Sequence, residues 1–453
     1  MKSKPNYSHF KSWKALLVAL LIFGATPQSN AATILQEEQQ EEQQEEQQEE
    51  QQEEFNQYKG KIIDANSKKE LVFATITIQN SNISTVTNTE GDFALKVPKA
   101  LADATVSISF LGYKTKELSL KELKESNKIA LETAVTALSE VNIVVPKNAE
   151  LLVRETLNKK GADYFEFPTL MTAFYRETIK KRKKNVSLSE AVVNIHKAPY
   201  TTKQNDAVEL YKARKSTDYS KLDTLTLKLQ GGPFNTLFID LMKYPEYVFT
   251  QETIPLYNYT FERSARINDQ LIYVINFSQK ENLTDQLYKG QLFIDAEHKI
   301  LTSAIYELNI TDRENAARMF VKRKPAKANV YPTAVAYRVD YREKDNKWYY
   351  GYSNVMLEFK INWDDRWFNS VYSMTCEMAV TDWEKNVGKN LRGKEKLRRN
   401  IILSDEALGF SDPDFWGEYN IIEPEKSIES AIKKIQRQIK KDKIGGTAAI
   451  PKP

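Results

Sequence analysis

The sequence predicts a mainly β protein, in which a small N-terminal β-sandwich is followed by a larger curved antiparallel sheet, half-barrel-like, with capping helices. Three observations lead to this prediction. Hydrophobic residues make up 41% and aromatic residues 11% of the 453 residues, which is enough for extended cores. Short alternating apolar runs separated by turn residues occupy residues 58–146. Longer alternating runs, with one apolar and one polar face, dominate from Tyr257 to about Val380.

Residues 1–31 have the pattern of a secretory signal peptide. Four lysines precede an apolar run from Ala15 to Ala25, and Ser29-Asn30-Ala31 offers a cleavage site. The alternative is an uncleaved membrane anchor, for which the apolar run is short. We therefore expect an exported protein of the periplasm or of the outer-membrane-associated cell envelope, with no transmembrane segment after cleavage.

Residues 32–57 are predicted to be a low-complexity linker. Within it, residues 36–54 repeat Gln and Glu every four positions and contain ten Glu and no basic residue. Each Glu has another Glu four positions away, which disfavours a helix, and no apolar face exists to dock the segment. Because the formal net charge of the whole chain is +4, the part from Phe55 onward is strongly basic and the molecule is charge-segregated.

Residues 58–146 are predicted to form the sandwich. Its expected strands are residues 59–64, 72–78, 93–97, 106–110 and 141–145. In "TNTEGDFAL", residues 87–95, Gly91 predicts a short hairpin loop, because glycine readily adopts the positive φ that such a loop needs.

The order of these strands and turns, "GKIID…ATITIQ…TNTEGDFALKVP…VSISFLGYKTKELSL", resembles the carboxypeptidase-like regulatory domain, a transthyretin-like sandwich. The resemblance implies a module that has no peptidase site of its own. It also implies a Bacteroidetes envelope protein, since the module is common there, including in the N-terminal extensions of TonB-dependent receptors.

Residues 147–445 are predicted to form a β-rich body with helices, followed by a flexible tail at 446–453. Apolar residues at helical spacing predict a helix over 149–157, and an isoleucine stripe predicts another over 427–441. The segments "FYRE", "LSEAVV…KAPY", "YKGQLFID" and "DFWGEYNIIEP…SIESAI" resemble the second region of Bacteroidetes proteins that carry the regulatory domain at the N-terminus. By architectural analogy, the sheet is similar to the open half-barrel of LolA-like lipoprotein carriers.

The apolar face of the long strands is the expected binding surface. A continuous apolar face must be covered by helices, by a partner or by a ligand. We expect a lipid-like or other hydrophobic ligand there, contacted by Tyr273, Phe277, Trp363 and Trp416. The alternative to a ligand-binding protein is a structural or docking component of an outer-membrane complex.

A basic run, Lys180-Lys181-Arg182-Lys183-Lys184, is the second candidate surface. Further basic runs lie at 322–324 and 394–399. An exported protein meets anionic lipid head groups or acidic glycans rather than nucleic acid, so contact with an anionic surface is the functional interpretation, and a solvated hairpin tip is the simpler one.

Catalytic chemistry has few candidate residues. After processing, His196 and His298 are the remaining histidines, and the single cysteine, Cys376, lies on the apolar face of a predicted strand. The sequence therefore predicts no metal and no cofactor, and favours a non-enzymatic protein. Carboxylates leave a glycan or peptide hydrolase as a further alternative; the candidates are Asp364, Asp365, Glu377 and Asp382.

Overall fold

The computed structural model describes four stretches of the chain, all within the compact unit Glu54–Pro453. They are residues 55–134 except 125; 148–217 except 160–162 and 183; 229–409 except 263, 264, 268, 269, 282, 284, 322, 323, 325, 366, 368, 387, 389, 390 and 392; and 415–425. The predicted signal peptide, residues 32–54 of the predicted linker, the strand at 141–145, the helix at 427–441 and the tail at 446–453 lie outside the described residues. The last three residues of the predicted linker, 55–57, are instead part of a strand. No helix in these stretches has the length and apolar character of a membrane span.

The N-terminal part is a seven-stranded sandwich, as the sequence predicts. One sheet has the order β4-β1-β7 and the other β3-β2-β5-β6. The strands are β1 (Phe55–Asp64), β2 (Thr75–Ile78), β3 (Ser84–Val86), β4 (Asp92–Pro98), β5 (Thr105–Ser109), β6 (Lys116–Ser119) and β7 (Asn127–Leu131), with short 3-10 turns at Lys99–Leu101 and Leu120–Glu122. Apolar side chains from both sheets fill the space between them.

The turn at Gly91 is not the predicted hairpin. Gly91 does adopt a positive φ, 74°, and a Cβ there would lie 2.8 Å from the carbonyl oxygen of Ile62. However, β3 pairs with β2 whereas β4 pairs with β1, so the turn carries the chain from one sheet to the other. Asn88 closes the turn, because its Oδ1 accepts hydrogen bonds from the backbone N–H groups of Glu90 and Asp92.

The C-terminal part is built on one 12-stranded sheet. Its order is β11-β13-β14-β15-β16-β17-β18-β8-β9-β10-β19, with β12 also paired to β13. All pairs are antiparallel except β10 with β19. The strands are β8 (Thr169–Lys181), β9 (Lys184–Lys197), β10 (Ala207–Thr217), β11 (Tyr257–Phe261), β12 (Ala265–Ile267), β13 (Gln270–Gln279), β14 (Tyr288–Asp295), β15 (Leu301–Leu308), β16 (Ala328–Lys344), β17 (Lys347–Trp363), β18 (Ser370–Lys385) and β19 (Leu408–Gly409).

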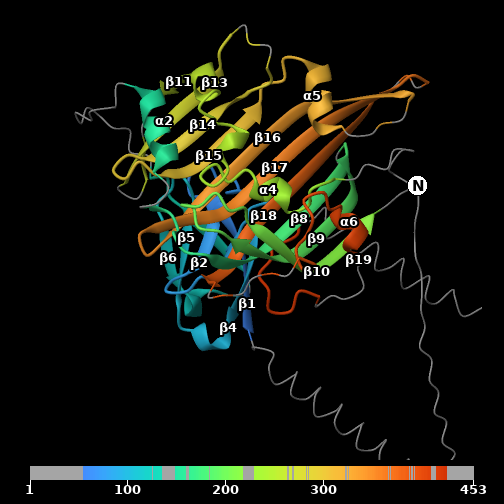
Figure 1. The fold of residues 1–453 in the computed structure, drawn as a ribbon. Coiled ribbons are helices and arrows are strands. Elements are labelled where there is room, and N and C mark those ends of the chain that lie inside the picture. Colours follow the sequence, from blue (N-terminus) through green and yellow to red (C-terminus); the bar gives the residue numbers. More distant parts are fainter. Residues whose placement is uncertain are drawn as a thin grey trace, which may run out of the picture. The chain divides into compact units, whose positions relative to one another are not determined.

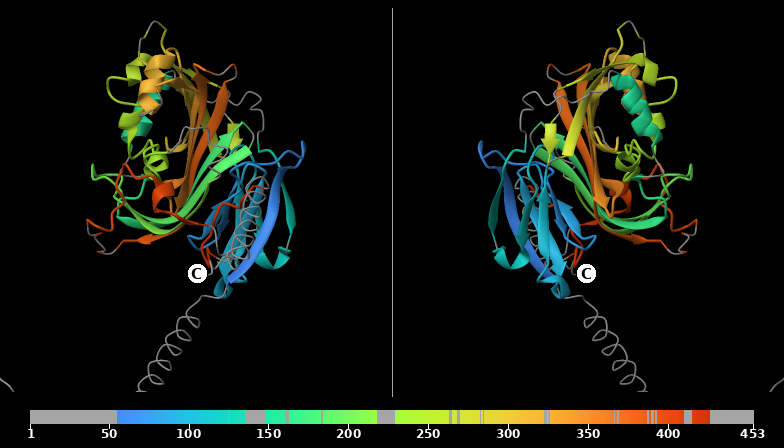
Figure 2. Two further views of the ribbon diagram at one scale, coloured as in Figure 1. Left: turned by 90° about the vertical axis from the view of Figure 1, so that its right-hand side faces the viewer. Right: turned by 90° about the vertical axis from the view of Figure 1, so that its left-hand side faces the viewer.

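The large sheet is strongly curved, and its two faces have different neighbours (Figures 1 and 2). The inner, concave face is covered by α2 (Ala149–Asn158), by α4 (Phe234–Leu237) and by the chain around 3-10 turns at Pro245–Tyr247 and Ile254–Leu256. The sandwich packs on the outer, convex face. The other helices are α5 (Arg313–Phe320) and α6 (Leu403–Glu406). The curved sheet with capping helices agrees with the predicted fold class.

Candidate functional site

The inner face of the sheet is filled by the protein's own side chains where the structure describes it. Tyr273 and Phe277, two of the predicted ligand contacts, are only 7% and 2% exposed. The ring of Phe277 packs edge-on against Phe249 and Tyr257, with centroids 5.1 and 5.4 Å away. Residues 229–257 lack strong periodicity in the sequence but fold over this face and cover it. Around Tyr273 and Phe277, the protein's own side chains therefore cover this face, and not a ligand as predicted.

The other two predicted ligand contacts lie elsewhere. Trp363, the last residue of β17, packs at the margin of the same inner core. Trp416 is buried on the outer face, where its ring contacts Phe174 at 5.4 Å and the guanidinium of Arg214 at 4.7 Å. The structure thus does not bring the four aromatic residues into one site.

A buried cluster of Lys197, Asp206 and Asp240 joins the sheet to the segments that cover its inner face. Lys197 Nζ lies 2.7 Å from Asp206 Oδ2 and 2.8 Å from Asp240 Oδ2. Asp240 also accepts hydrogen bonds at 2.9 Å from the hydroxyls of Tyr200 and Tyr341. Burial lowers the pKa of Lys197, but the two carboxylates outweigh burial, so the net shift is upward. This cluster is enclosed in the core and anchors the covering segment.

A second buried network lies on the outer face under residues 415–425. Arg176 donates from Nε to Glu190 Oε1 at 2.8 Å, from Nη1 to Glu377 Oε1 at 3.2 Å and from Nη2 to the carbonyl oxygen of Ile422 at 2.7 Å. Arg214 Nε donates to the other oxygen of Glu190 at 2.9 Å. Burial raises the pKa of Glu377, and Arg176 opposes this shift.

The candidate carboxylates for hydrolysis are not assembled into one site. Glu377 belongs to the buried network in β18, whereas Asp364 and Asp365 are exposed in the turn before that strand. Glu377 lies seven positions after Ser370 along β18, which corresponds to roughly 20 Å. Asp382 is exposed at a bulge in β18.

The cysteine and the two histidines that the structure describes are buried or bonded to neighbouring side chains or backbone. Cys376 is buried, and burial raises the pKa of its thiol well above the ordinary value. His196 lies beside Asn386 and Glu209, and His298 lies in the predicted turn, with its N–H on Asp295. Among the described residues, no three His, Cys, Asp or Glu side chains are grouped so as to hold a metal ion.

The sandwich is attached to the outer face by hydrogen bonds between residues far apart in the chain. Ser84 donates to the carbonyl oxygen of Val380 at 3.1 Å, and Asn82 donates to that of Trp383 at 2.6 Å. Asn88, which closes the turn at Gly91, donates to the carbonyl oxygen of Glu423 at 3.0 Å. The conspicuous "TNTEG" turn therefore holds the C-terminal segment as well as linking the two sheets of the sandwich.

Phe73 is the main aromatic anchor of this junction. Its φ is 65°, an uncommon conformation for a bulky residue. Its ring stacks on Tyr352 of β17 with centroids 4.9 Å apart, and the guanidinium of Arg338 lies 5.5 Å from it. The left-handed backbone is thus retained where the ring makes a contact between the sandwich and the sheet.

The two roles of Phe73 predict an unusual order of stability. Phe73→Ala removes the ring and keeps a Cβ in the left-handed region, whereas Phe73→Gly removes the ring and relieves that strain. We expect both variants to be less stable than the wild type, and the glycine variant to be more stable than the alanine variant by about 1 kcal/mol in urea unfolding. Equal stabilities, or a more stable alanine variant, would contradict this account.

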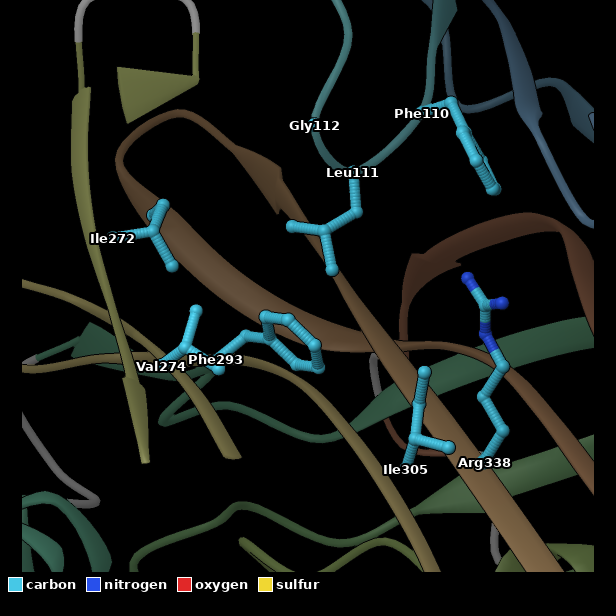
Figure 3. Close-up of a pocket in the computed structure, with 8 residues that line it drawn as sticks. All are labelled: Phe110, Leu111, Gly112, Ile272, Val274, Phe293, Ile305 and Arg338. Atoms are coloured by element: carbon cyan, nitrogen blue, oxygen red, sulfur yellow. The ribbon is translucent and has the colours of Figure 1, made fainter. Parts of the chain in front are cut away.

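An apolar groove lies between the sandwich and the outer face, beside this junction (Figure 3). Its volume is about 280 Å³, slightly below the range of roughly 300–1,000 Å³ that is usual for ligand pockets. Phe110, Leu111 and Gly112 line it from the sandwich, and Ile272, Val274, Phe293, Ile305 and Arg338 line it from β13–β16. Leu111 points between Ile272 and Phe293 (Figure 3), and Ile305 is 39% exposed. We name this feature the outer groove.

The loop that overhangs the groove has a defined conformation. Gly112 has a φ of 88°, which favours glycine, and its carbonyl oxygen accepts from the N–H of Ala134 at 2.9 Å. Tyr113 donates to Asp64 Oδ2 at 2.8 Å. The backbone N–H of Ser67 and this tyrosine lower the pKa of Asp64 to about 2. The loop therefore presents Phe110 and Leu111 to the groove from a fixed position.

The outer groove was not predicted from the sequence, although one signal for it was present. β13 is apolar on both faces: Tyr273, Ile275 and Phe277 face the inner core, whereas Ile272 and Val274 occupy the face expected to be polar. Apolar residues on both faces of a strand indicate that both faces are covered. Arg338 closes one end of the groove, and its Nε donates to Asp340 Oδ2 at 2.7 Å.

Comparison with known proteins identifies the class of the N-terminal part. Residues 58–145 match the family model of the CarboxypepD_reg-like domain, which confirms the predicted regulatory-type sandwich. Phe110, Leu111 and Gly112 of the outer groove lie within this domain. No curated protein sequence matches the chain.

Solved structures give weaker similarities. The chain is similar to lipovitellin, described in terms of its lipid–protein interactions, with TM-score 0.27 and 8% identity over 56% of this chain and 28% of lipovitellin. It is similar to a domain described as an outer membrane lipoprotein-sorting protein from Vibrio parahaemolyticus, with TM-score 0.24 and 12% identity over 53% and 94% of the two chains. A DUF1329 family protein from Desulfovibrio piger gives TM-score 0.22 and 10% identity over 53% and 93%. TM-scores of this size do not establish a common fold.

Proposed function

We propose that this chain is an exported, non-enzymatic protein of the cell envelope that binds a lipid-like group in the outer groove. The observation that carries the proposal is the groove itself, in which the sandwich and the large sheet together form an open apolar recess. Exposing Leu111, Phe293 and Ile305 to water is unfavourable by roughly 25 cal/mol per Å² of apolar surface. An apolar ligand that covers them recovers part of this free energy.

The composition of the lining favours a ligand that is mostly hydrocarbon. Aliphatic and aromatic side chains line the recess, and the charged side chain in the lining, Arg338, is paired with Asp340. A groove of about 280 Å³ suits a branched apolar group or a segment of an acyl chain. The signal-like residues 1–31 and the regulatory-type domain support a location in the envelope.

The buried charges support a binding role over a catalytic one. Lys197 is held by Asp206 and Asp240, and Arg176 is held by Glu190 and Glu377. Lys197 thereby joins the sheet to the segment that covers its inner face, and Arg176 joins three neighbouring strands of the sheet, so both cations are engaged in contacts within the fold.

Binding is tested with a fluorescent fatty acid and two groove variants. Leu111→Arg and Ile305→Arg place a charge in the recess and are each expected to weaken binding about tenfold or more, since a buried aliphatic side chain contributes about 1.5–3 kcal/mol. The matched control is Leu151→Arg on α2, because Leu151 is 52% exposed and lies away from the groove. Mass spectrometry of lipids extracted from the purified chain identifies the natural ligand.

Two results would count against the proposal. One is wild-type protein that carries no lipid and binds no probe; the other is equal binding by Leu111→Arg and Leu151→Arg. If lipid is absent but an outer-membrane protein is retained in pull-down experiments and lost on Leu111→Arg, the groove instead serves a docking component of an outer-membrane complex.

A further inference from the structure

Three loops of the large sheet meet at one of its ends, as strand pairing shows. Lys181 of β8 pairs with Tyr372 of β18, and the N–H of Arg182 donates to the carbonyl oxygen of Val371 at 2.9 Å. At the start of β16, Ala328 pairs with Trp363 at the end of β17. The turns that leave β8, β17 and α5 are therefore neighbours at this end of the sheet. We name the described residues of these turns the hairpin end; its members are Lys181, Arg182, Lys184, Lys324, Lys327, Asp364, Asp365 and Trp367.

A fully exposed tryptophan lies at the hairpin end. Trp367 is 98% exposed in the turn between β17 and β18. A large aromatic side chain in water is unfavourable, whereas tryptophan is enriched where one side of the ring is apolar and the other is wet, as at a bilayer interface. A second exposed apolar side chain, Met319, lies in the last turn of α5, the helix that leads to Lys324. Trp367 was not among the residues singled out from the sequence.

Basic residues lie in the turns that neighbour the turn of this tryptophan. Arg182, Lys184, Lys324 and Lys327 are exposed, and Lys181 lies beside the ring of Tyr372. The acidic residues of the hairpin end are Asp364 and Asp365, so basic side chains outnumber acidic ones. The N–H of Asp364 donates to the carbonyl oxygen of Lys327 at 3.1 Å, which brings the two turns into direct contact. Lys180, by contrast, is paired with Glu425 at 3.2 Å and belongs to the junction.

We propose that the hairpin end docks onto an anionic lipid bilayer, with Trp367 at the interface and the basic side chains against the head groups. Each Lys or Arg near an anionic leaflet contributes on the order of 1 kcal/mol, and the attraction falls with salt. The surface is separate from the outer groove, so this proposal does not rest on the proposed function. It also divides the predicted basic run: Arg182 and Lys184 face the bilayer, Lys180 stabilises the junction, and Lys183 lies outside the described residues.

The proposal is tested by sedimentation of the full chain with phosphatidylcholine vesicles, with and without phosphatidylglycerol. We expect binding only when phosphatidylglycerol is present and a decrease in binding with added salt. Arg182→Glu/Lys184→Glu is expected to weaken binding by about tenfold to a hundredfold. The matched control, Lys116→Glu/Lys128→Glu, makes the same charge change at exposed positions of the sandwich and is expected to bind like the wild type.

Trp367→Ala provides an independent readout. In the wild type, anionic vesicles are expected to shift the tryptophan emission to the blue, and the variant is expected to lose this shift and bind about tenfold more weakly. Equal sedimentation of both charge variants, or an unchanged emission shift in Trp367→Ala, would overturn the proposal. So would binding to a soluble acidic polysaccharide with no binding to anionic vesicles, which would point to a glycan surface.

Discussion

Replacing Lys197 with methionine is expected to destabilise the protein by about 3–5 kcal/mol, because it leaves two buried carboxylates without their cation. Asp206 and Asp240 have no exposed side-chain surface, so water cannot replace the lost partner. The free energy of unfolding in urea at neutral pH measures this loss. Since Asp240 belongs to the segment that covers the inner face, we also expect faster proteolysis within residues 229–257.

An exposed ion pair provides the control for this variant. Lys289 lies 3.0 Å from Glu307 with both side chains about half exposed, so Lys289→Met is expected to change stability by less than about 1 kcal/mol. If Lys197→Met does not fold, the triple variant Lys197→Met/Asp206→Asn/Asp240→Asn is expected to recover part of the stability, because it removes the uncompensated charge. A cost for Lys197→Met no larger than that of Lys289→Met would show that the cluster does not stabilise the core.

Glu177→Gln is expected to have the opposite effect and to stabilise the protein at alkaline pH. Glu177 is buried on the inner side of β8, where it accepts a hydrogen bond from Tyr175 Oη at 2.8 Å. Burial raises the pKa of Glu177 from 4.5 to about 7. The folded state therefore holds the proton more tightly than the unfolded state does. The stability that this group contributes is complete below the pKa of the unfolded state and is lost as the pH rises through the pKa of the folded state.

The size of this effect follows from the same shift. At about 1.4 kcal/mol per pKa unit, the wild type loses about 3 kcal/mol between about pH 4 and about pH 8, and Glu177→Gln avoids the loss while keeping an acceptor for Tyr175. Urea unfolding of both proteins at the two pH values measures the difference. Glu117→Gln at an exposed position of β6 is the control; it keeps Glu177 and is therefore expected to lose stability with rising pH as the wild type does. Parallel pH profiles for the wild type and Glu177→Gln would contradict the assignment.

The periodic spacing of apolar residues in the sequence predicted secondary structure that is set by residues close together in the chain. The alternation in residues 59–110 and from Tyr257 to Val380 predicted strands that the structure contains, and the helical spacing at 149–157 predicted α2, which Asn148 caps. These features follow from side-chain period alone, because a strand exposes alternate residues on opposite faces and a helix repeats every 3.6 residues. The strands β6 and β7 were not predicted.

Only the tertiary structure shows which segments pack on each face of the large sheet, and therefore where an open groove remains. Residues 229–257 cover the inner face, and the sandwich sits on the outer face through contacts such as Asn82 with Trp383, residues that are 301 positions apart. Such contacts leave no local period in the sequence, since they depend on the folded path of the whole chain. For the same reason the sequence could show that β13 is apolar on both sides, but only the fold shows that one side is packed core and the other is an open groove.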